Sequence, residues 1–166
     1  MLGLVIANAV RMPLAAYLES RIWQPMGAEA DAAWVVDSKG VEIASSGLCA
    51  TLRDWARLGL IMAYDGAWNG RQIVPRQWVQ DGTTPAAPYL TPSLSPPRLG
   101  YRYQVWLQPA SRRQFSFRGV HGQAIYVDPA ARLVLVHTAV RLKPSADPAA
   151  QELGALWQAL VTRYGN

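Results

Sequence analysis

A histidine flanked by glycines is the feature of this sequence whose residue types and spacing most directly suggest chemistry. Gly119, His121 and Gly122 interrupt apolar runs that read as β-strand on both sides. Glycine inside a strand pattern marks a bulge or a place where another group approaches the backbone closely. A histidine there could polarise a substrate or carry a proton, because its unperturbed pKa is about 6.5. The sequence is equally consistent with a structural role, in which His121 is a spacer and its imidazole packs at a strand edge.

Other polar side chains are weaker candidates for chemistry. Ser45 and Ser46 have no lysine or histidine close in sequence, so a turn or cap role is expected for both. Asp54 and Asp128 are expected to cap a helix start and a turn, and His137 reads as a sheet histidine. No spacing of Cys, His, Asp and Glu predicts a metal site, and no glycine-rich loop leads from a strand into a helix. We therefore expect neither a metal nor a cofactor.

Length and composition favour one globular domain. The chain has 166 residues, 51% of them hydrophobic, and a formal net charge of +5. The positive charge comes from scattered arginines, because Lys39 and Lys143 are the only lysines. A nucleic-acid surface would cluster such charges, so no nucleic-acid partner is predicted. Cys49 is alone, which excludes an internal disulfide and predicts a small core side chain.

The first residues are as apolar as the core of a signal peptide. However, no basic residue precedes residues 2–10 and no small-residue cleavage site follows them. The stretch is also shorter than the roughly 20 residues that a membrane span needs. It predicts a buried helix, and no signal peptide or membrane span is expected in this chain. The sequence does not determine the cellular compartment, and it weakly favours the cytoplasm.

Helical spacing dominates the first half of the chain. It predicts a second helix over 13–23 and a third that starts at Thr51 and stops at Gly66. Pro75 opens a further short helix. Between the second and third helices, a turn at 37–40 joins two short extended runs and predicts a hairpin.

The second half predicts a sheet and a closing helix. Residues 82–100 hold five prolines and form a long loop that could border a site. The alternation beyond this loop predicts three or four antiparallel strands. Asp147 is expected to cap a final helix with Pro148 in its first turn. The apolar stripe of that helix consists of Leu153, Leu156, Trp157, Leu160, Val161 and Tyr164.

These elements predict an α+β fold. An antiparallel sheet carries the packed C-terminal helix, and the remaining helices precede it. The strand patterns cover 101–108, 124–127 and 133–140, with a turn at 128–131. We expect one domain over 1–166, in which 1–81 is mainly helical, 82–100 is the proline-rich loop, and 101–166 forms the sheet and closing helix.

Two long stretches resemble the C-terminal half of the serine β-lactamase-related hydrolases. They are "SGLCATLRDWARLGLIMAYDGAWNGRQIVPRQWV" (46–79) and "GVHGQAIYVDPAARLVLVHTAV" (119–140). That family contains class C β-lactamases, penicillin-binding proteins, related esterases and hydrolases of 6-aminohexanoate oligomers. The pattern "GxWxGxQIVPxxWV" at 66–79 is most similar to the last group. The resemblance implies part of a β-lactamase/transpeptidase-like fold.

The resemblance also implies where a substrate would lie. The family uses a Ser-x-x-Lys nucleophile, a Tyr-x-Asn or Tyr-x-Ser proton shuttle and a Lys-Thr-Gly-like strand. Val120, His121 and Gly122 match the three positions of the strand motif, and the backbone amide of Gln123 is the candidate oxyanion donor. Gly119 would flank a substrate carbonyl on this strand. By the same analogy, Ser46 and Gly47 border the cleft.

Two elements of the family chemistry are missing from the sequence. Val36 and Val140 stand three residues before the two lysines, so the chain contains no Ser-x-x-Lys. The only Tyr-x-Asn, at 164–166, follows the strand motif and is attributed to chance. In the family, the nucleophile, its lysine and the tyrosine precede the segment that resembles residues 2–5. We therefore expect a fragment that begins just after the tyrosine motif and has no catalytic nucleophile of its own.

The resemblance implies a small ester or amide substrate that forms an acyl-enzyme in the complete protein. The isolated chain is then expected to be inactive. The alternative, from another class, is a non-catalytic remnant or a binding module that retains the groove. In that case an exposed apolar face at residues 2–10, where absent helices would pack, favours association with a partner.

Overall fold

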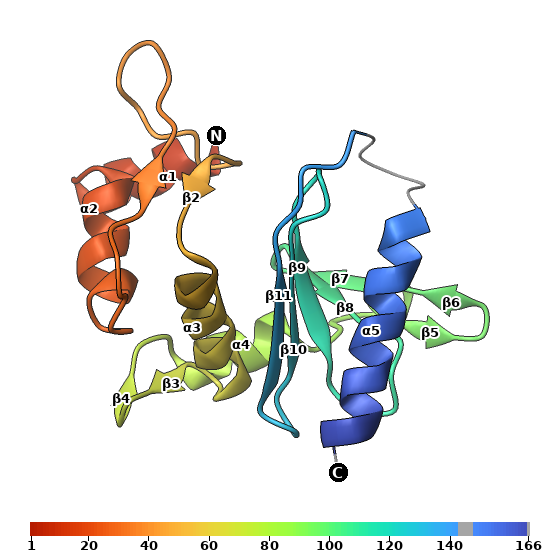
Figure 1. Cartoon of the computed structure of the whole chain (residues 1–166). Helices are drawn as coiled ribbons and strands as arrows, with labels where there is room; N and C mark the ends of the chain where they lie inside the picture. Colours follow the sequence, from red (N-terminus) through yellow and green to blue (C-terminus); the bar gives the residue numbers. More distant parts are fainter. Residues whose placement is uncertain (143–147, 166) are drawn as a thin grey trace.

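The computed structural model describes residues 1–142 and 148–165 of the chain (Figure 1). Helices come first, followed by a five-stranded antiparallel sheet and one closing helix. This order and the antiparallel pairing confirm the predicted α+β fold. The expected cap at Asp147 lies outside the described residues.

Two helical segments open the chain. Helix α1 (Leu2–Val10) is followed by α2 (Leu14–Leu18), which continues into the π-helical turn η1 (Glu19–Trp23). The prediction that residues 2–10 form a helix is confirmed, but the prediction that this helix is buried is wrong. Gly3 is its only buried residue, and the side chains of Leu2, Leu4 and Val5 are 54–60% exposed. In Figure 1, α3 packs against the sheet, whereas α1 and α2 lie apart from it.

The hairpin predicted around 37–40 is only partly formed. The Asp37 carboxylate accepts hydrogen bonds from the Lys39 and Val41 amides at 2.8 and 3.0 Å, which confirms the turn. The flanking runs form a single bridge, and regular pairing occurs further out between β1 (Ala33–Trp34) and β2 (Leu48–Cys49). Cys49 is exposed, so its prediction as a core side chain is wrong.

Helix α3 (Leu52–Ala63) forms as its sequence predicts. The Asp54 amide donates to the Thr51 hydroxyl oxygen at 3.1 Å, which caps the first turn. Gly66 follows the helix with φ +86°, a conformation that favours glycine. A small hairpin, β3 (Ala67–Trp68) and β4 (Arg71–Gln72), leads from there into the next helix.

The proline-rich region contains more regular structure than predicted. The short helix α4 (Arg76–Gly82) follows Pro75 as expected. Beyond it, the chain forms a 3-10 turn, η2 (Pro88–Leu90). A hairpin follows, made of the two-residue strands β5 (Ser93–Leu94) and β6 (Pro97–Arg98).

The sheet has the strand order β11-β10-β9-β8-β7. The single strand predicted over 101–108 is wrong, because Tyr103 and Gln104 have φ of +46° and +63° and turn the chain back on itself. Two residues with positive φ form a tight hairpin turn, although asparagine and glycine are usual there. The strands are β7 (Gly100–Arg102), β8 (Val105–Leu107), β9 (Phe115–Arg118), β10 (Ala124–Asp128) and β11 (Leu133–His137).

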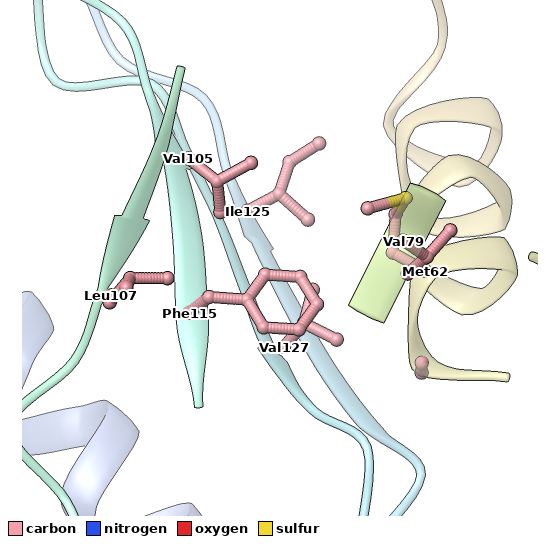
Figure 2. Close-up of a cluster of buried hydrophobic side chains, with 8 residues drawn as sticks. Met62, Val79, Val105, Leu107, Phe115, Ile125 and Val127 are labelled. Carbon is pink, nitrogen blue, oxygen red and sulfur yellow. The ribbon is translucent and has the colours of Figure 1, made fainter. Parts of the chain in front are cut away.

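Strand β10 sits between two hydrophobic clusters. Ile125 and Val127 face α3 and α4, as Figure 2 shows, whereas Ala124 and Tyr126 face α5 (Pro148–Tyr164). This alternation follows from the two-residue period of a strand. The first cluster consists of Met62, Ala63, Val79, Val105, Leu107, Phe115, Ile125 and Val127.

The closing helix packs on the sheet face opposite α3 (Figure 1). Leu153 and Trp157 of its predicted stripe are buried there. Leu156 and Tyr164 are 50% and 62% exposed, so the stripe that contacts the sheet is narrower than predicted.

Candidate functional site

The segment Gly119–Gln123 connects β9 to β10. The expected strand over 120–122 is wrong, because β9 ends at Arg118 and β10 begins at Ala124. The Gly119 amide donates to the Gln123 carbonyl at 2.8 Å and closes the connection. Gly122 has φ +95°, which favours glycine and directs the chain back into the sheet.

Hydrogen bonds fix this connection to the segment that follows β11. The Arg141 amide donates to the His121 carbonyl at 2.9 Å, and Nε2 of Gln123 donates to the Ala139 carbonyl at 2.9 Å. His137 is half-buried, and its Nδ1 lies 3.0 Å from the Gly122 carbonyl oxygen. The connection is thus held in one conformation by residues some 15 to 20 positions away in sequence.

The imidazole of His121 is exposed and oriented by its own hydrogen bond. Its Nδ1 lies 2.8 Å from the carbonyl oxygen of Arg141. A carbonyl can only accept, so Nδ1 carries the proton and Nε2 of the neutral ring is an acceptor. This arrangement would allow Nε2 to take up a proton from a bound group.

Side chains of the same chain account for the close approach at the two glycines. A Cβ at Gly119 would meet the amide oxygen of Gln123, and a Cβ at Gly122 would lie 2.5 Å from Nε of Arg141. The Gln123 amide oxygen also accepts from the His121 amide at 3.2 Å. The glycines therefore permit the tight connection whether or not a ligand is bound.

Ser45, Ser46 and Gly47 lie in a turn before β2. The Ser46 amide donates to the Ile43 carbonyl at 3.1 Å, which agrees with the expected turn role. Gly47 has φ +80°, and its carbonyl accepts from the Val35 amide at 3.0 Å. The turn is thus built by local backbone contacts.

The structure places the two groups of candidates on different cavities. Ser45 borders a cavity of about 510 Å³ beside α1. Gly119, Gly122 and Gln123 border a cavity of about 230 Å³ between the sheet and α5. No single one of these cavities holds both groups, so a site that joined them would need further walls.

A buried polar cluster lies next to the smaller cavity, and sequence reasoning missed it as a group. Ser116 is fully buried, and its hydroxyl oxygen accepts from Nε2 of Gln108 at 2.8 Å and Nε of Arg118 at 3.0 Å. The sequence feature that could have indicated this cluster is a serine between Phe115 and Phe117 in an apolar run. Neither partner can act as a base, so the cluster binds Ser116 in place and does not activate it as a nucleophile.

Two aspartates confirm their predicted capping roles. Asp128 accepts from the Ala131 amide at 3.1 Å across the β10–β11 turn. Burial alone raises the pKa of Asp54, but hydrogen bonds from the Glu29 amide and the Thr51 hydroxyl oppose that effect. The Arg57 guanidinium adds a contact of 2.8 Å, and together these partners hold the pKa of Asp54 below its usual range.

Residues 1–142 and 148–165 contain neither a cluster of metal-ligating side chains nor a single membrane-spanning helix. Within these ranges, no three His, Cys, Asp or Glu side chains gather where they could hold a metal ion. No single helix there is long and apolar enough to cross a membrane, and Leu2–Val10 with Leu14–Trp23 reaches that length only as a pair bent by 71°.

Comparison with known proteins decides the family. The β-lactamase family model matches residues 1–156. The chain belongs to the β-lactamase family. The 6-aminohexanoate-dimer hydrolase of Paenarthrobacter ureafaciens is 31% identical to this chain over 123 residues. Those residues make up 72% of this chain but 31% of that enzyme.

Solved structures of β-lactamase-related proteins support the same fold. A candidate 6-aminohexanoate-dimer hydrolase from Bacillus anthracis matches with a TM-score of 0.80 and 28% identity, over 96% of this chain and 40% of that chain. A β-lactamase from Mycobacterium bovis matches with a TM-score of 0.68 and 20% identity, over 96% of this chain and 59% of that chain. The chain therefore spans less than two thirds of the length of each of these relatives.

Proposed function

We propose that this chain is the C-terminal part of a β-lactamase-related serine hydrolase that acts on a small ester or amide. Family membership and the similarity to 6-aminohexanoate-dimer hydrolase support this reading. The observation that carries it is the fixed connection at 119–123, combined with a sequence that contains no Ser-x-x-Lys. The isolated chain would then hold a substrate-facing segment without a nucleophile.

In the complete protein, the serine oxygen would attack the substrate carbonyl and form a tetrahedral oxyanion. Collapse of that intermediate would expel the alcohol or amine with a proton, and water would then hydrolyse the acyl-enzyme. We assign the backbone N–H of Gln123 as one donor to the oxyanion. Gly119, Val120, His121 and Gly122 would line the substrate beside it, with Ser46 and Gly47 at the border.

The hydrogen bonds that fix the 119–123 connection suit it to the proposed role in oxyanion binding. Oxyanion donors are effective when they are already oriented before charge develops, because no reorganisation is then needed. The hydrogen bonds of His121 and Gln123 to residues 139–141 hold the connection in this way. Val120 is 66% exposed and is not occupied in packing the core. An apolar side chain here favours an uncharged substrate group over the carboxylate of a penicillin.

The proposed oxyanion donor is tested by complementation. The chain is mixed with the separately expressed part of the Paenarthrobacter enzyme that precedes its matched segment. Complex formation is followed by size-exclusion chromatography, and hydrolysis is measured with p-nitrophenyl butyrate. We expect hydrolysis by the complex and none by either part. Gln123→Pro removes the N–H and should lower kcat about 10²–10³-fold.

Gln123→Ala is the matched control, because it keeps the backbone N–H and removes the side-chain hydrogen bonds to Ala139 and His121. A complex in which both variants hydrolyse the ester equally fast would exclude the assigned donor. A complex that forms but hydrolyses nothing would instead favour a second function, that of a binding module. The exposed apolar side chains of Leu2, Leu4 and Val5 are the observation that supports this alternative.

A further inference from the structure

A third cavity lies at the opposite end of the sheet from the 119–123 connection. Its volume is about 400 Å³, and the β10–β11 turn forms one wall. Strand β10 separates this turn from the connection, and at about 3.3 Å per residue it spans roughly 13 Å. Figure 1 shows the two turns at opposite ends of β10. The cavity is lined by Ala63, Tyr64, Asp65, Arg76, Arg113, Pro129, Ala130 and Arg132.

Positive charge is concentrated in this cavity. Asp65 is the only carboxylate among the lining residues, which include three arginines. Nη2 of Arg113 lies 2.6 Å from Oδ1 of Asp65, whereas Nη1 of Arg76 lies 3.5 Å from Oδ2. One carboxylate balances one guanidinium, which leaves a formal excess of two positive charges.

Two of the arginines are held in place by the neighbouring residues Asp65 and Tyr64. Nη1 of Arg113 donates to the Thr83 hydroxyl at 3.0 Å while Nη2 binds Asp65, so this guanidinium is fixed by two partners. The guanidinium of Arg132 lies over the ring of Tyr64, 5.1 Å from its centroid. Stacking of this kind orients a guanidinium and leaves its N–H edge available for a ligand.

The backbone at Arg132 supports a role beyond structure. Its φ is +51°, in the left-handed region where glycine or asparagine is the usual residue. An arginine here is strained, and such strain recurs where a side chain has a function to perform. Asp65 also has a positive φ, +52°, which aspartate tolerates better than arginine does.

We propose that this cavity binds a dianionic phosphate group, with Arg76, Arg113 and Arg132 as its ligands. Guanidinium groups bind phosphate oxygens through paired N–H donors, and two charges on the ligand match the excess of the cavity. The group could belong to free phosphate or to a phosphate monoester, since both present the same oxygens. The site is independent of the proposed hydrolase chemistry, because none of its residues lies in the 119–123 connection.

The test is a titration of the whole chain followed by ¹H–¹⁵N NMR. Inorganic phosphate and phenyl phosphate are added in separate series at constant ionic strength, because salt screens such contacts. We expect saturable shifts centred on the amides of Asp65, Arg113 and Arg132, with a dissociation constant of about 1 mM or lower for at least one probe. Tighter binding of phenyl phosphate would identify a monoester, and equal or weaker binding would identify free phosphate.

Variants decide whether the arginines are the ligands. Arg132→Asn removes the charge but keeps a residue that tolerates positive φ, and Arg76→Gln removes a side chain that is 61% exposed. Each should weaken binding at least tenfold. Arg53→Gln removes an arginine that is 82% exposed outside the cavity and should leave binding unchanged. Absence of saturable shifts, equal binding of acetate, or unchanged binding in both cavity variants would overturn the proposal.

Discussion

Arg112 and Asp128 form an ion pair whose carboxylate is completely buried, with Nη2 of Arg112 2.7 Å from Oδ2 of Asp128. Nε2 of Gln114 donates to the same oxygen at 2.8 Å. Nη1 of Arg112 donates to the Gly165 carbonyl at 2.6 Å, just after α5. A single arginine thus joins the end of β10 to the end of the closing helix.

Removing this arginine should destabilise the fold. Arg112→Met leaves the Asp128 carboxylate buried without its cation, so we expect the free energy of unfolding to fall by about 3–5 kcal/mol. Urea denaturation followed by circular dichroism measures the change. Arg163→Gln, on the exposed side of α5, is the control and should shift stability by less than about 0.5 kcal/mol. A loss below about 1 kcal/mol in Arg112→Met would contradict the importance of this pair.

The lowered pKa of Asp54 predicts a dependence of stability on acid pH. A carboxyl whose folded pKa lies below its unfolded value, about 3.9, stabilises the fold fully above that value. The contribution is lost as the pH falls from there through the folded pKa. Asp54→Asn should therefore be less stable at neutral pH and lose less stability below pH of about 4. Urea titrations across the acid range would refute this if both proteins lost stability in parallel.

Gly122 should resist substitution for two reasons. Its φ of +95° disfavours any residue with a Cβ, and that Cβ would meet the side chain of Arg141. We expect Gly122→Ala to lower the free energy of unfolding by about 1–2 kcal/mol. Gly154→Ala is the matched control, because α5 has open space there and alanine favours a helix by roughly 1 kcal/mol. Equal stability changes in the two variants would argue against this reading of the connection.

Local sequence signals predicted the elements that local contacts define. Helix α3 begins where Thr51 and Asp54 predict, because the cap involves residues three apart. The turn at Tyr103 and Gln104 escaped prediction, because neither residue is typical of positive φ and the surrounding alternation continues through it. The exposure of Leu156 likewise depends on how α5 is set against the sheet, which the stripe alone does not determine.

The sequence predicted the candidate site only in part, for the same reason. The glycines and His121 drew attention to 119–123 in the sequence, but the contacts that fix this segment come from His137, Ala139 and Arg141. The cavity lined by Arg76, Arg113 and Arg132 combines residues from 63 to 132, and no sequence motif marks it. Pairings between residues this far apart depend on strand register and helix packing, which only the folded chain defines.

We propose that this chain carries no catalytic nucleophile of its own, because its sequence contains no Ser-x-x-Lys. The most direct measurement is incubation of the purified 166-residue chain with a fluorophosphonate, which reacts covalently with activated serines, followed by intact-mass spectrometry. We predict an unmodified mass and no hydrolysis of p-nitrophenyl butyrate above buffer. A stoichiometric adduct that maps to Ser45, Ser46 or Ser116 would contradict the claim and place a nucleophile within this chain.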